Sequence, residues 1–224
     1  MTPVEDVDVD DVVARLGRLD SCAVSDALDK LGLTGAVAGI HRMSADRRVA
    51  GRVLTVKLVA GDGRASPRHL GTAAIDGAQP GDIIVVEQRT GIDAAGWGGT
   101  LSLGARLRGV AGVIVDGPAR DVDESAQHNF PVFARSRTSR TARGRLVEAG
   151  TNVPIAVGDI RVAAGDFVVA DGSGVVFVAA HEIERVLEAA EAIAARERSM
   201  AEALRAGTPI SQVMGASYET MLKE

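Results

Sequence analysis

Cysteine, histidine and aromatic residues are all scarce in this chain of 224 residues. It has one cysteine, Cys22, four histidines and 3% aromatic residues. A lone cysteine cannot form an internal disulfide or supply a thiolate cage for a metal. The histidines are far apart and show no closely spaced pair, so a histidine-rich zinc site is not expected. If a metal takes part in the function, we expect a hard ion held by carboxylate and water.

Lysine is scarce too, with three lysines against twenty-two arginines. Chemistry through a lysine imine would therefore depend on Lys30, Lys57 or Lys223. Only Lys57 lies in an apolar strand pattern, and the alternation around it favours a solvated position on the polar face.

The chain also lacks a basic excess and a long apolar run. Its net charge is −5 and its pI is about 5.5, so no basic field extends over it to attract a nucleic acid. The first eleven residues are acidic, whereas a secretory signal starts with a basic segment. Apolar stretches such as residues 109–115 are far shorter than a bilayer span. These features predict a cytoplasmic protein that binds a small molecule and has no membrane or nucleic-acid partner.

With 46% hydrophobic residues, the chain has enough apolar material for a real core, and no linker divides it. We therefore expect a single domain over residues 1–224. Its expected parts are N-terminal helices in residues 1–35, a β-rich core in residues 36–180 and a helical segment in residues 181–224.

Helical periodicity is clear near both ends. Apolar residues recur every three or four positions in residues 7–17 and 22–31, and Asp20 or Ser21 can cap the second of these helices. Residues 181–205 show a long amphipathic pattern. A helix of this length on one domain often packs against a neighbouring subunit.

Short apolar runs separated by Gly and Pro are typical of strands and fill the middle of the chain. Residues 101–108 read as a helix between two of these runs, and residues 69–75 are a second candidate, so crossover connections and parallel pairing are expected. Gly-Asp turns at residues 81–82 and 165–166 lead into two similar β elements. The expected strands are residues 51–60, 82–87, 110–116, 132–134, 153–157, 167–170 and 175–178.

The segment with the most candidate binding residues begins with two glycines. Gly98 and Gly99 precede a helix, where free backbone N–H groups can receive a carboxylate or a phosphate. Trp97 beside them is interpreted as a pocket wall. Taken alone, the two glycines can equally be a simple turn.

The next strand completes this segment. It is expected to end in a turn at residues 116–118 that brings Arg120 and Asp121 to the carboxyl edge of the sheet, where α/β folds bind ligands. Arg120 can hold a carboxylate through two hydrogen bonds, and Asp121 can hold a divalent cation. The pair alone is more often an exposed ion pair; its combination with the glycines in one strand–helix–strand unit favours a site.

Residues 108–121, RGVAGVIVDGPARD, resemble the most specific motif of the RraA-like proteins, R-G-V-x-G-V-V-x-D-G-x-x-R-D. This family includes 4-hydroxy-4-methyl-2-oxoglutarate/4-carboxy-4-hydroxy-2-oxoadipate aldolases and the regulator of ribonuclease activity. The resemblance extends over nearly the whole chain, through residues 24–29, 80–82, 98–100, 130–135, 165–166 and 171–176.

The resemblance implies an α/β fold: a single swivelling β/β/α-type domain with N-terminal helices and a long C-terminal helix. It implies assembly as a homotrimer or a dimer of trimers, with active sites between subunits. It further implies Mg²⁺ or Mn²⁺ beside Asp121, which polarises the 2-keto oxygen so that an enolate forms, and a pyruvyl carboxylate bound by Arg120. The backbone amides that help to bind this carboxylate are implied at Gly98, Gly99, Thr100 and Leu101.

The aldolases of this family also use a glutamate from the C-terminal helix of the adjacent subunit, which the resemblance assigns to Glu197; the alternative is a solvated helix glutamate. The chain departs from the family at Gly99, where the G-[DE]-L pattern has an acidic residue that orients the water for proton transfer. Asp93 is an alternative source of a carboxylate. Decarboxylation of oxaloacetate needs only the metal-stabilised enolate and is the less demanding reaction.

A second departure is a run of five arginines within eleven residues. A solvated loop balanced by acidic patches is the favoured interpretation, and an anion-binding loop for a larger or phosphorylated acid is the alternative. No aromatic residues lie between these arginines, which disfavours a single-stranded nucleic-acid platform. The run consists of Arg135, Arg137, Arg140, Arg143 and Arg145.

Together these features predict a metal-dependent carbon–carbon lyase, an aldolase or oxaloacetate decarboxylase, acting on a small 2-oxo acid. Arg120 would bind its carboxylate, Asp121 would hold the ion and Glu197 of a neighbour would assist proton transfer. One alternative is a protein-binding regulator of a ribonuclease. Another is a biosynthetic enzyme that uses the same pocket for a different carboxylic acid.

Overall fold

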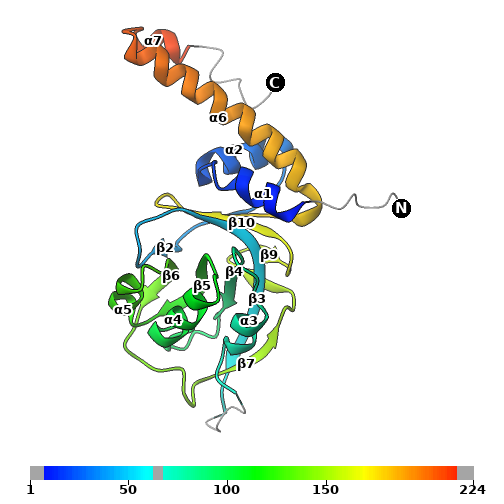
Figure 1. Ribbon diagram of the computed structural model, residues 1–224, viewed down its shortest axis with the longest axis vertical. Coiled ribbons are helices and arrows are strands. Elements are labelled where there is room, and N and C mark those ends of the chain that lie inside the picture. Colours follow the sequence, from blue (N-terminus) through cyan, green and yellow to red (C-terminus); the bar gives the residue numbers. More distant parts are fainter. Residues whose placement is uncertain (1–7, 63–67, 216–224) are drawn as a thin grey trace, which may run out of the picture.

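The computed structural model describes residues 8–62 and 68–215. Helices from the two ends of the chain and helices from its middle cover different faces of a curled mixed sheet (Figure 1). In these two segments, no helix combines the length and the apolar character needed to cross a membrane. The order of helices and strands confirms the predicted α/β fold with N-terminal helices and a long C-terminal helix.

The elements follow one another along the chain as helices, strands and crossovers. The helices are α1 (Val9–Leu16), α2 (Ser21–Leu31), α3 (Thr72–Gly77), α4 (Gly99–Leu107), α5 (Val122–Gln127), α6 (Ile183–Arg205) and α7 (Ile210–Val213), with a 3-10 turn at Ala180–Glu182. The strands are β1 (Ala36–Val37), β2 (His41–Arg42), β3 (Val49–Ala60), β4 (Ile83–Glu87), β5 (Gly112–Ala119), β6 (Val132–Arg137), β7 (Leu146–Thr151), β8 (Ile155–Val157), β9 (Ile160–Val162), β10 (Phe167–Ala170) and β11 (Val175–Val178).

The two N-terminal helices begin at aspartates that satisfy their free N–H groups. The Asp8 carboxylate accepts a hydrogen bond from Asp10 N at 3.0 Å, and that of Asp20 accepts one from Ala23 N at 2.8 Å. The second helix ends at Gly32, whose φ of 68° lies in the left-handed region that glycine adopts easily. Both predicted helices and the Asp20 cap are confirmed.

The long strand β3 connects two parts of the sheet. Its first residues pair antiparallel with β10, and from Val53 onward it pairs parallel with β4 and, near its end, antiparallel with β7. Strands β4, β5 and β6 continue the parallel part, with α4 crossing between β4 and β5. The predicted crossover and parallel pairing are confirmed.

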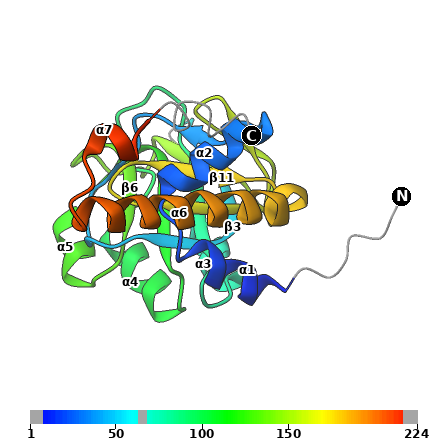
Figure 2. The same cartoon turned by 90° about the horizontal axis from the view of Figure 1, so that it is seen from above.

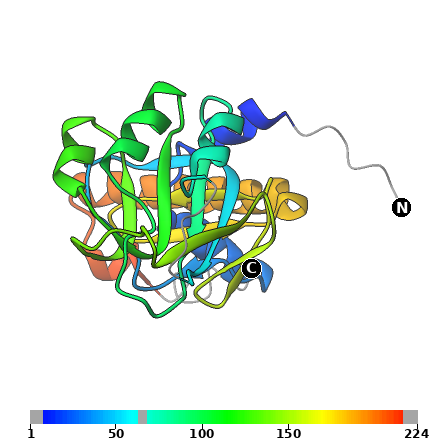
Figure 3. The same cartoon turned by 90° about the horizontal axis from the view of Figure 1, so that it is seen from below.

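The parallel strands are buried on both faces, which explains their unbroken apolar runs. In β4, Ile84 and Val86 pack in the core beneath α3 and α4, whereas Ile83 and Val85 face the core formed with β10 and β11. The helices from the middle of the chain, coloured cyan to green, lie together on one side of the sheet (Figure 3). This side carries the candidate site.

Helices α1, α2 and α6 form a third core against β10 and β11. Figure 2 shows α6 crossing above α2 and β11. The buried residues of α6 all lie in its first half, from Ile183 to Ile193. None of residues 194–205 is buried, so the second half of this helix extends past the core (Figure 1).

The two Gly-Asp turns have the same construction, as the sequence predicts. Gly81 and Gly165 have φ values of 89° and 94°. Asp82 Oδ2 accepts a hydrogen bond from Gln79 N at 2.8 Å, and Asp166 Oδ2 accepts one from Ala163 N at the same distance. Each turn therefore closes on its own aspartate before the strand begins.

The turn predicted at residues 116–118 is wrong, because β5 continues as a strand to Ala119. Its pairing with β6 shifts register between Val115 and Pro118, so a bulge takes the place of a turn. Asp116 is buried in the sheet and accepts hydrogen bonds from Arg135 Nε and, at 2.8 Å, from Gly158 N. The strand still delivers the following residues to its carboxyl edge.

Candidate active site

A small pocket lies where the N-terminus of α4 meets the end of β5 and the loop after β6. Its volume is about 80 Å³, well below the roughly 300 Å³ of the smallest sites that hold drug-sized ligands. It can therefore accept a small acid. The lining residues are His69, Leu70, Ala95, Trp97, Gly98, Gly99, Thr100, Leu101, Arg120, Asp121, Thr141 and Ala142.

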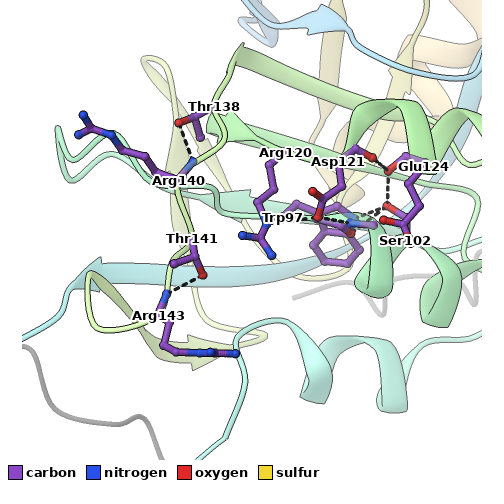
Figure 4. Close-up of polar contacts among 12 residues, drawn as sticks. Trp97, Ser102, Arg120, Asp121, Glu124, Thr138, Arg140, Thr141 and Arg143 are labelled. Carbon is purple, nitrogen blue, oxygen red and sulfur yellow. Dashed lines mark hydrogen bonds and ion pairs between the residues drawn. The ribbon is translucent and has the colours of Figure 1, made fainter.

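Arg120 and Asp121 lie side by side in this pocket (Figure 4). Arg120 Nε is 3.2 Å from Asp121 Oδ2, and both side chains are 37% exposed. Asp121 Oδ2 also accepts a hydrogen bond from Gly99 N at 3.1 Å. The structure thus brings together the Arg-Asp pair and the glycines that the sequence singles out.

The glycine at position 98 lets this pair approach the backbone closely. A Cβ on Gly98 would lie 2.9 Å from Asp121 Oδ2 and 3.3 Å from Arg120 Nε. Of the predicted amide donors, Gly99 N is already bonded to Asp121. The N–H groups of Thr100 and Leu101 have no acceptor among the described residues, so they are available to a ligand carboxylate.

Two buried serines fix the start of α4 against the start of α5. Ser102 Oγ and Ser125 Oγ are 2.8 Å apart, and Ser125 Oγ donates to the Asp121 carbonyl at 3.1 Å. Trp97 Nε1 donates to Ser102 Oγ at 3.0 Å, and the Trp97 ring stacks on Phe130 with centroids 6.5 Å apart. Trp97 is therefore both a pocket wall, as predicted, and a packed core residue.

The donor set fits a hard divalent cation better than zinc. Among the described residues that line this pocket, Asp121 is the only one with a carboxylate. Within residues 8–62 and 68–215, no group of three or more His, Cys, Asp or Glu side chains is arranged to hold a metal. Mg²⁺ is commonly held by one or two carboxylates together with waters and substrate oxygens, whereas zinc requires several nitrogen or sulfur ligands.

Glu197 lies outside this pocket in the same chain. It is an exposed residue in the second half of α6, which Figure 1 shows at the opposite end of the molecule from α4 and α5. Partial desolvation, together with the negative charges of Asp20 and Asp26, raises the pKa of the Glu197 carboxyl above its ordinary value. Its role in a neighbouring subunit stays a prediction.

Two residues of the arginine run pair with other parts of the chain, and a third bonds within the run. Arg135 pairs with the buried Asp116, and Arg140 Nε lies 3.4 Å from Asp93 Oδ2. Arg145 Nη1 donates to the Thr141 carbonyl at 3.1 Å. Asp93, the alternative source of a carboxylate, is thus engaged on this loop and does not line the pocket.

Sequence reasoning missed His69 and Thr141 as lining residues. Both come from loops without a recognisable motif, and only the tertiary arrangement brings them to the pocket. Two turns shape the loop that carries Thr141: Thr141 Oγ1 accepts from Arg143 N, and Thr138 Oγ1 accepts from Arg140 N, each at 3.2 Å (Figure 4). A second hollow shares His69 and Ala142 with the pocket and is lined by Arg143 as well.

Comparison with known proteins identifies relatives over most of the chain. The family model described as "RraA-like: Aldolase/RraA" matches residues 21–177. A "Putative 4-hydroxy-4-methyl-2-oxoglutarate aldolase" of Halalkalibacterium halodurans is 31% identical over 181 residues, covering 81% of this chain and 82% of that protein. The protein DlpA of Legionella pneumophila is 24% identical over 93% of this chain, which spans only 34% of DlpA.

Solved structures support the same fold. The crystal structure of an uncharacterized protein from Pseudomonas syringae pv. tomato superposes with a TM-score of 0.82 at 30% identity, covering 92% of this chain and 98% of that one. RraAS2 of Streptomyces coelicolor, described as an unusual member of the RNase ES inhibitor RraA family, gives a TM-score of 0.75 at 24% identity, covering 84% and 94%. At that identity the likeness to RraAS2 concerns the fold alone.

Proposed function

The chain belongs to the RraA-like family of aldolase and RraA proteins, and from that premise we propose that it is a divalent-metal-dependent carbon–carbon lyase. Its substrate is a small 2-oxo acid that reacts through a pyruvate enolate, by aldol cleavage or by decarboxylation of oxaloacetate. One observation carries the proposal: a pocket of about 80 Å³ holds the Arg120–Asp121 pair and the open N-terminus of α4. We place this activity in the cytoplasm.

Arg120 binds the carboxylate of the 2-oxo acid. Its guanidinium is partly exposed in the pocket and presents a planar set of donors that matches a carboxylate. The free N–H groups of Thr100 and Leu101 lie at the positive end of the α4 dipole and add two more donors. Together they hold the substrate in one orientation, with its keto group toward Asp121.

Asp121 holds the cofactor that we propose, Mg²⁺ or Mn²⁺. A divalent ion bound there would supply Lewis-acid stabilisation of negative charge on the substrate. Asp121 can point a carboxylate oxygen at the ion because Gly99 N and Arg120 Nε fix the orientation of the carboxylate. None of the described residues that line the pocket is a lysine that could serve the alternative imine chemistry.

On this proposal, the active site is completed by a residue from a second copy of the chain. Glu197, whose pKa is raised, would reach the pocket of a neighbouring subunit in a homotrimer or a dimer of trimers and carry a proton there. The second half of α6 extends past its own core, as such an interface requires. The Arg120–Asp121 pair within a pocket supports a lyase rather than a protein-binding regulator of a ribonuclease.

The test is pyruvate release from oxaloacetate and from 4-hydroxy-4-methyl-2-oxoglutarate, with Mg²⁺ or Mn²⁺ and then with EDTA. We expect EDTA-sensitive release well above the free-metal background.

Arg120→Lys is expected to lose at least tenfold in activity, about 1.4 kcal/mol, because lysine cannot bind a carboxylate in bidentate fashion. Arg161→Lys, on an exposed residue of β9, is the matched control. Silence on both substrates would exclude the lyase proposal and favour a different acid or a binding role.

A further inference from the structure

The side-chain position of Gly99 is occupied by Glu124. An ideal Cβ on Gly99 would lie 2.0 Å from Glu124 Oε2 and 2.4 Å from Glu124 Cδ, far inside van der Waals contact. The φ of Gly99 lies outside the left-handed region, so its backbone conformation does not itself demand glycine. The Glu124 carboxylate therefore occupies the space that a side chain at position 99 would take.

The Glu124 carboxylate accepts no hydrogen bond within the part of the chain that the structure describes. Its side chain is 49% exposed, and neither carboxylate oxygen accepts a hydrogen bond from a described residue. His128 Nε2 lies 3.8 Å from Glu124 Oε1. That Nε2 atom is buried and has no hydrogen-bond partner in residues 8–62 and 68–215, which is unusual for a polar atom.

Glu124 also lies next to the proposed cation ligand. Asp121 precedes α5 and Glu124 lies in its first turn, so the two residues share one side of the helix. Figure 4 shows Glu124 beyond Asp121 on the side away from Arg120. Gly99 lines the pocket, and its Cβ position adjoins the Glu124 carboxylate, so Glu124 lies next to a lining residue although it does not line the pocket itself.

We propose that Glu124 is a positioning residue for the reaction proposed above, on which this inference rests. Its carboxylate accepts a hydrogen bond from a water beside the bound substrate, and α5 thereby supplies the group that position 99 on α4 cannot carry. A carboxylate one water away from the reacting atoms fixes that water at small entropic cost. In aldol cleavage the substrate hydroxyl gives its proton to this water as the carbon–carbon bond breaks into a carbonyl product and an enolate. The enolate carbon then takes a proton from the water, so the water is regenerated.

The first test compares Glu124→Gln, Gly99→Ala and Gly104→Ala. Removing the Glu124 charge is expected to lower kcat about 10- to 100-fold with little change in KM, the usual effect of losing a group that supports a metal site. Gly99→Ala should lower kcat to a similar degree, because the new methyl group displaces the flexible Glu124 side chain. Gly104→Ala is the matched control in the same helix, since nothing lies within 4 Å of its Cβ position.

Coupling between the two positions gives a second, sharper test. In the Glu124→Ala background, Gly99→Ala is expected to cause no further loss of kcat, because the side chain it displaces is already absent. Gly99→Asp with Glu124→Ala moves the carboxylate back to α4 and should recover at least tenfold over Glu124→Ala alone, about 1.4 kcal/mol. Gly99→Asp alone forces two carboxylates together and should lower the melting temperature, which Glu124→Ala then restores.

The outcomes separate this inference from the function on which it rests. A wild-type protein without metal-dependent lyase activity overturns the proposed function. An active wild type whose Glu124→Gln variant keeps full kcat overturns the role of Glu124 alone. Independent losses for Gly99→Ala and Glu124→Ala would also overturn it, because they would show that the glycine does not act through this carboxylate.

Discussion

At Asp121 the backbone and the side chain are both held by the site. Its φ of 53° and ψ of 38° lie in the left-handed region, which aspartate and asparagine tolerate better than most residues. Its carbonyl accepts from Ser125 Oγ, and its Oδ2 accepts from Gly99 N. The preceding Arg120 N donates to the Trp97 carbonyl at 3.0 Å. These bonds set the direction in which the carboxylate can face a ligand.

Substitutions of Asp121 are therefore expected to separate the effect of its charge on activity from the effect of backbone strain on stability. Asp121→Asn keeps the left-handed preference and should leave stability almost unchanged, while metal-dependent pyruvate release falls at least tenfold, about 1.4 kcal/mol. Asp121→Ala should lose this activity too and should lower the free energy of unfolding by about 1–2 kcal/mol more, because alanine is strained in this conformation. Denaturant unfolding and the pyruvate assay measure the two effects.

Asp123→Asn is the control for this pair, since Asp123 is an exposed residue of the same short helix. It should keep both activity and stability. If Asp121→Asn retains full EDTA-sensitive turnover, Asp121 does not hold the ion.

The residues of the Arg-Asp motif could be predicted because strand and motif are contiguous in the sequence. Arg120 and Asp121 follow β5 directly, so the end of one strand places them both. The relation between Gly99 and Glu124 could not be predicted in this way, because it depends on how closely α4 and α5 pack. The sequence indicates that a carboxylate is missing at Gly99, but only the packing of α5 shows which residue fills the space.

At the scale of elements, segments with a clear apolar pattern were predictable, including the four-residue strands β10 and β11, whereas segments without one were not. Helices α1, α2 and α6 have clear amphipathic periodicity, and β4 and β5 are continuous apolar runs. Helix α5 has six residues and no side-chain cap, and β7 is mostly half-exposed, so neither leaves a pattern. Strands β1 and β2 have two residues each and exist only through their pairing with β11 and β6.

The wrongly predicted turn in β5 has a tertiary cause. Gly and Pro after an aspartate usually signal a turn. Here the neighbouring strand end requires the glycine, because a Cβ on Gly117 would lie 2.6 Å from the Gln88 carbonyl oxygen. Asp116 is stabilised inside the sheet by Arg135, a partner nineteen residues away. Long-range pairing thus overrides the local turn preference.

Helix α2 is attached to the sheet through Asp171, at the end of β10. Burial alone raises the pKa of Asp171, but hydrogen bonds from Ser21 N at 2.8 Å, Ser21 Oγ at 2.7 Å and Ser173 N at 2.9 Å hold that pKa below its ordinary value. The carboxylate therefore binds a proton less readily in the folded chain than in the unfolded one. It adds stability that is present above the unfolded pKa of about 3.9 and is lost as the pH falls through the folded pKa.

We expect Asp171→Asn to lower the free energy of unfolding by about 1–3 kcal/mol at neutral pH, because the hydrogen bonds to a charged acceptor are weakened. The difference from wild type should shrink as the pH falls below about 4. Urea unfolding over a pH series measures this, with Asp159→Asn on an exposed residue as control. A difference that does not change with pH would contradict the assignment of this carboxylate.

At the scale of the whole molecule, the candidate site and the helix that carries Glu197 lie at opposite ends (Figure 1). The second half of α6 has no buried residue, and Leu204 on it is 39% exposed. A helix with this little support from its own chain is typically stabilised by a partner. Assembly into a ring of copies would bring the exposed half of α6 of one subunit to the pocket of the next.

A mixture of two inactive variants tests whether the site is shared in this way. Arg120→Ala removes the carboxylate anchor from the pocket, and Glu197→Gln removes the proton carrier from α6, so each homo-oligomer should have low activity. When the two variants are co-expressed, about one site in four combines an intact pocket with an intact Glu197, if subunits associate at random. We therefore expect activity near a quarter of wild type.

The matched control combines Arg120→Ala with Asp121→Asn, which alter the same side of the interface and can restore no site when mixed. If the first mixture is no more active than its parents, each subunit works alone, and Glu197 has no part in a neighbour's site.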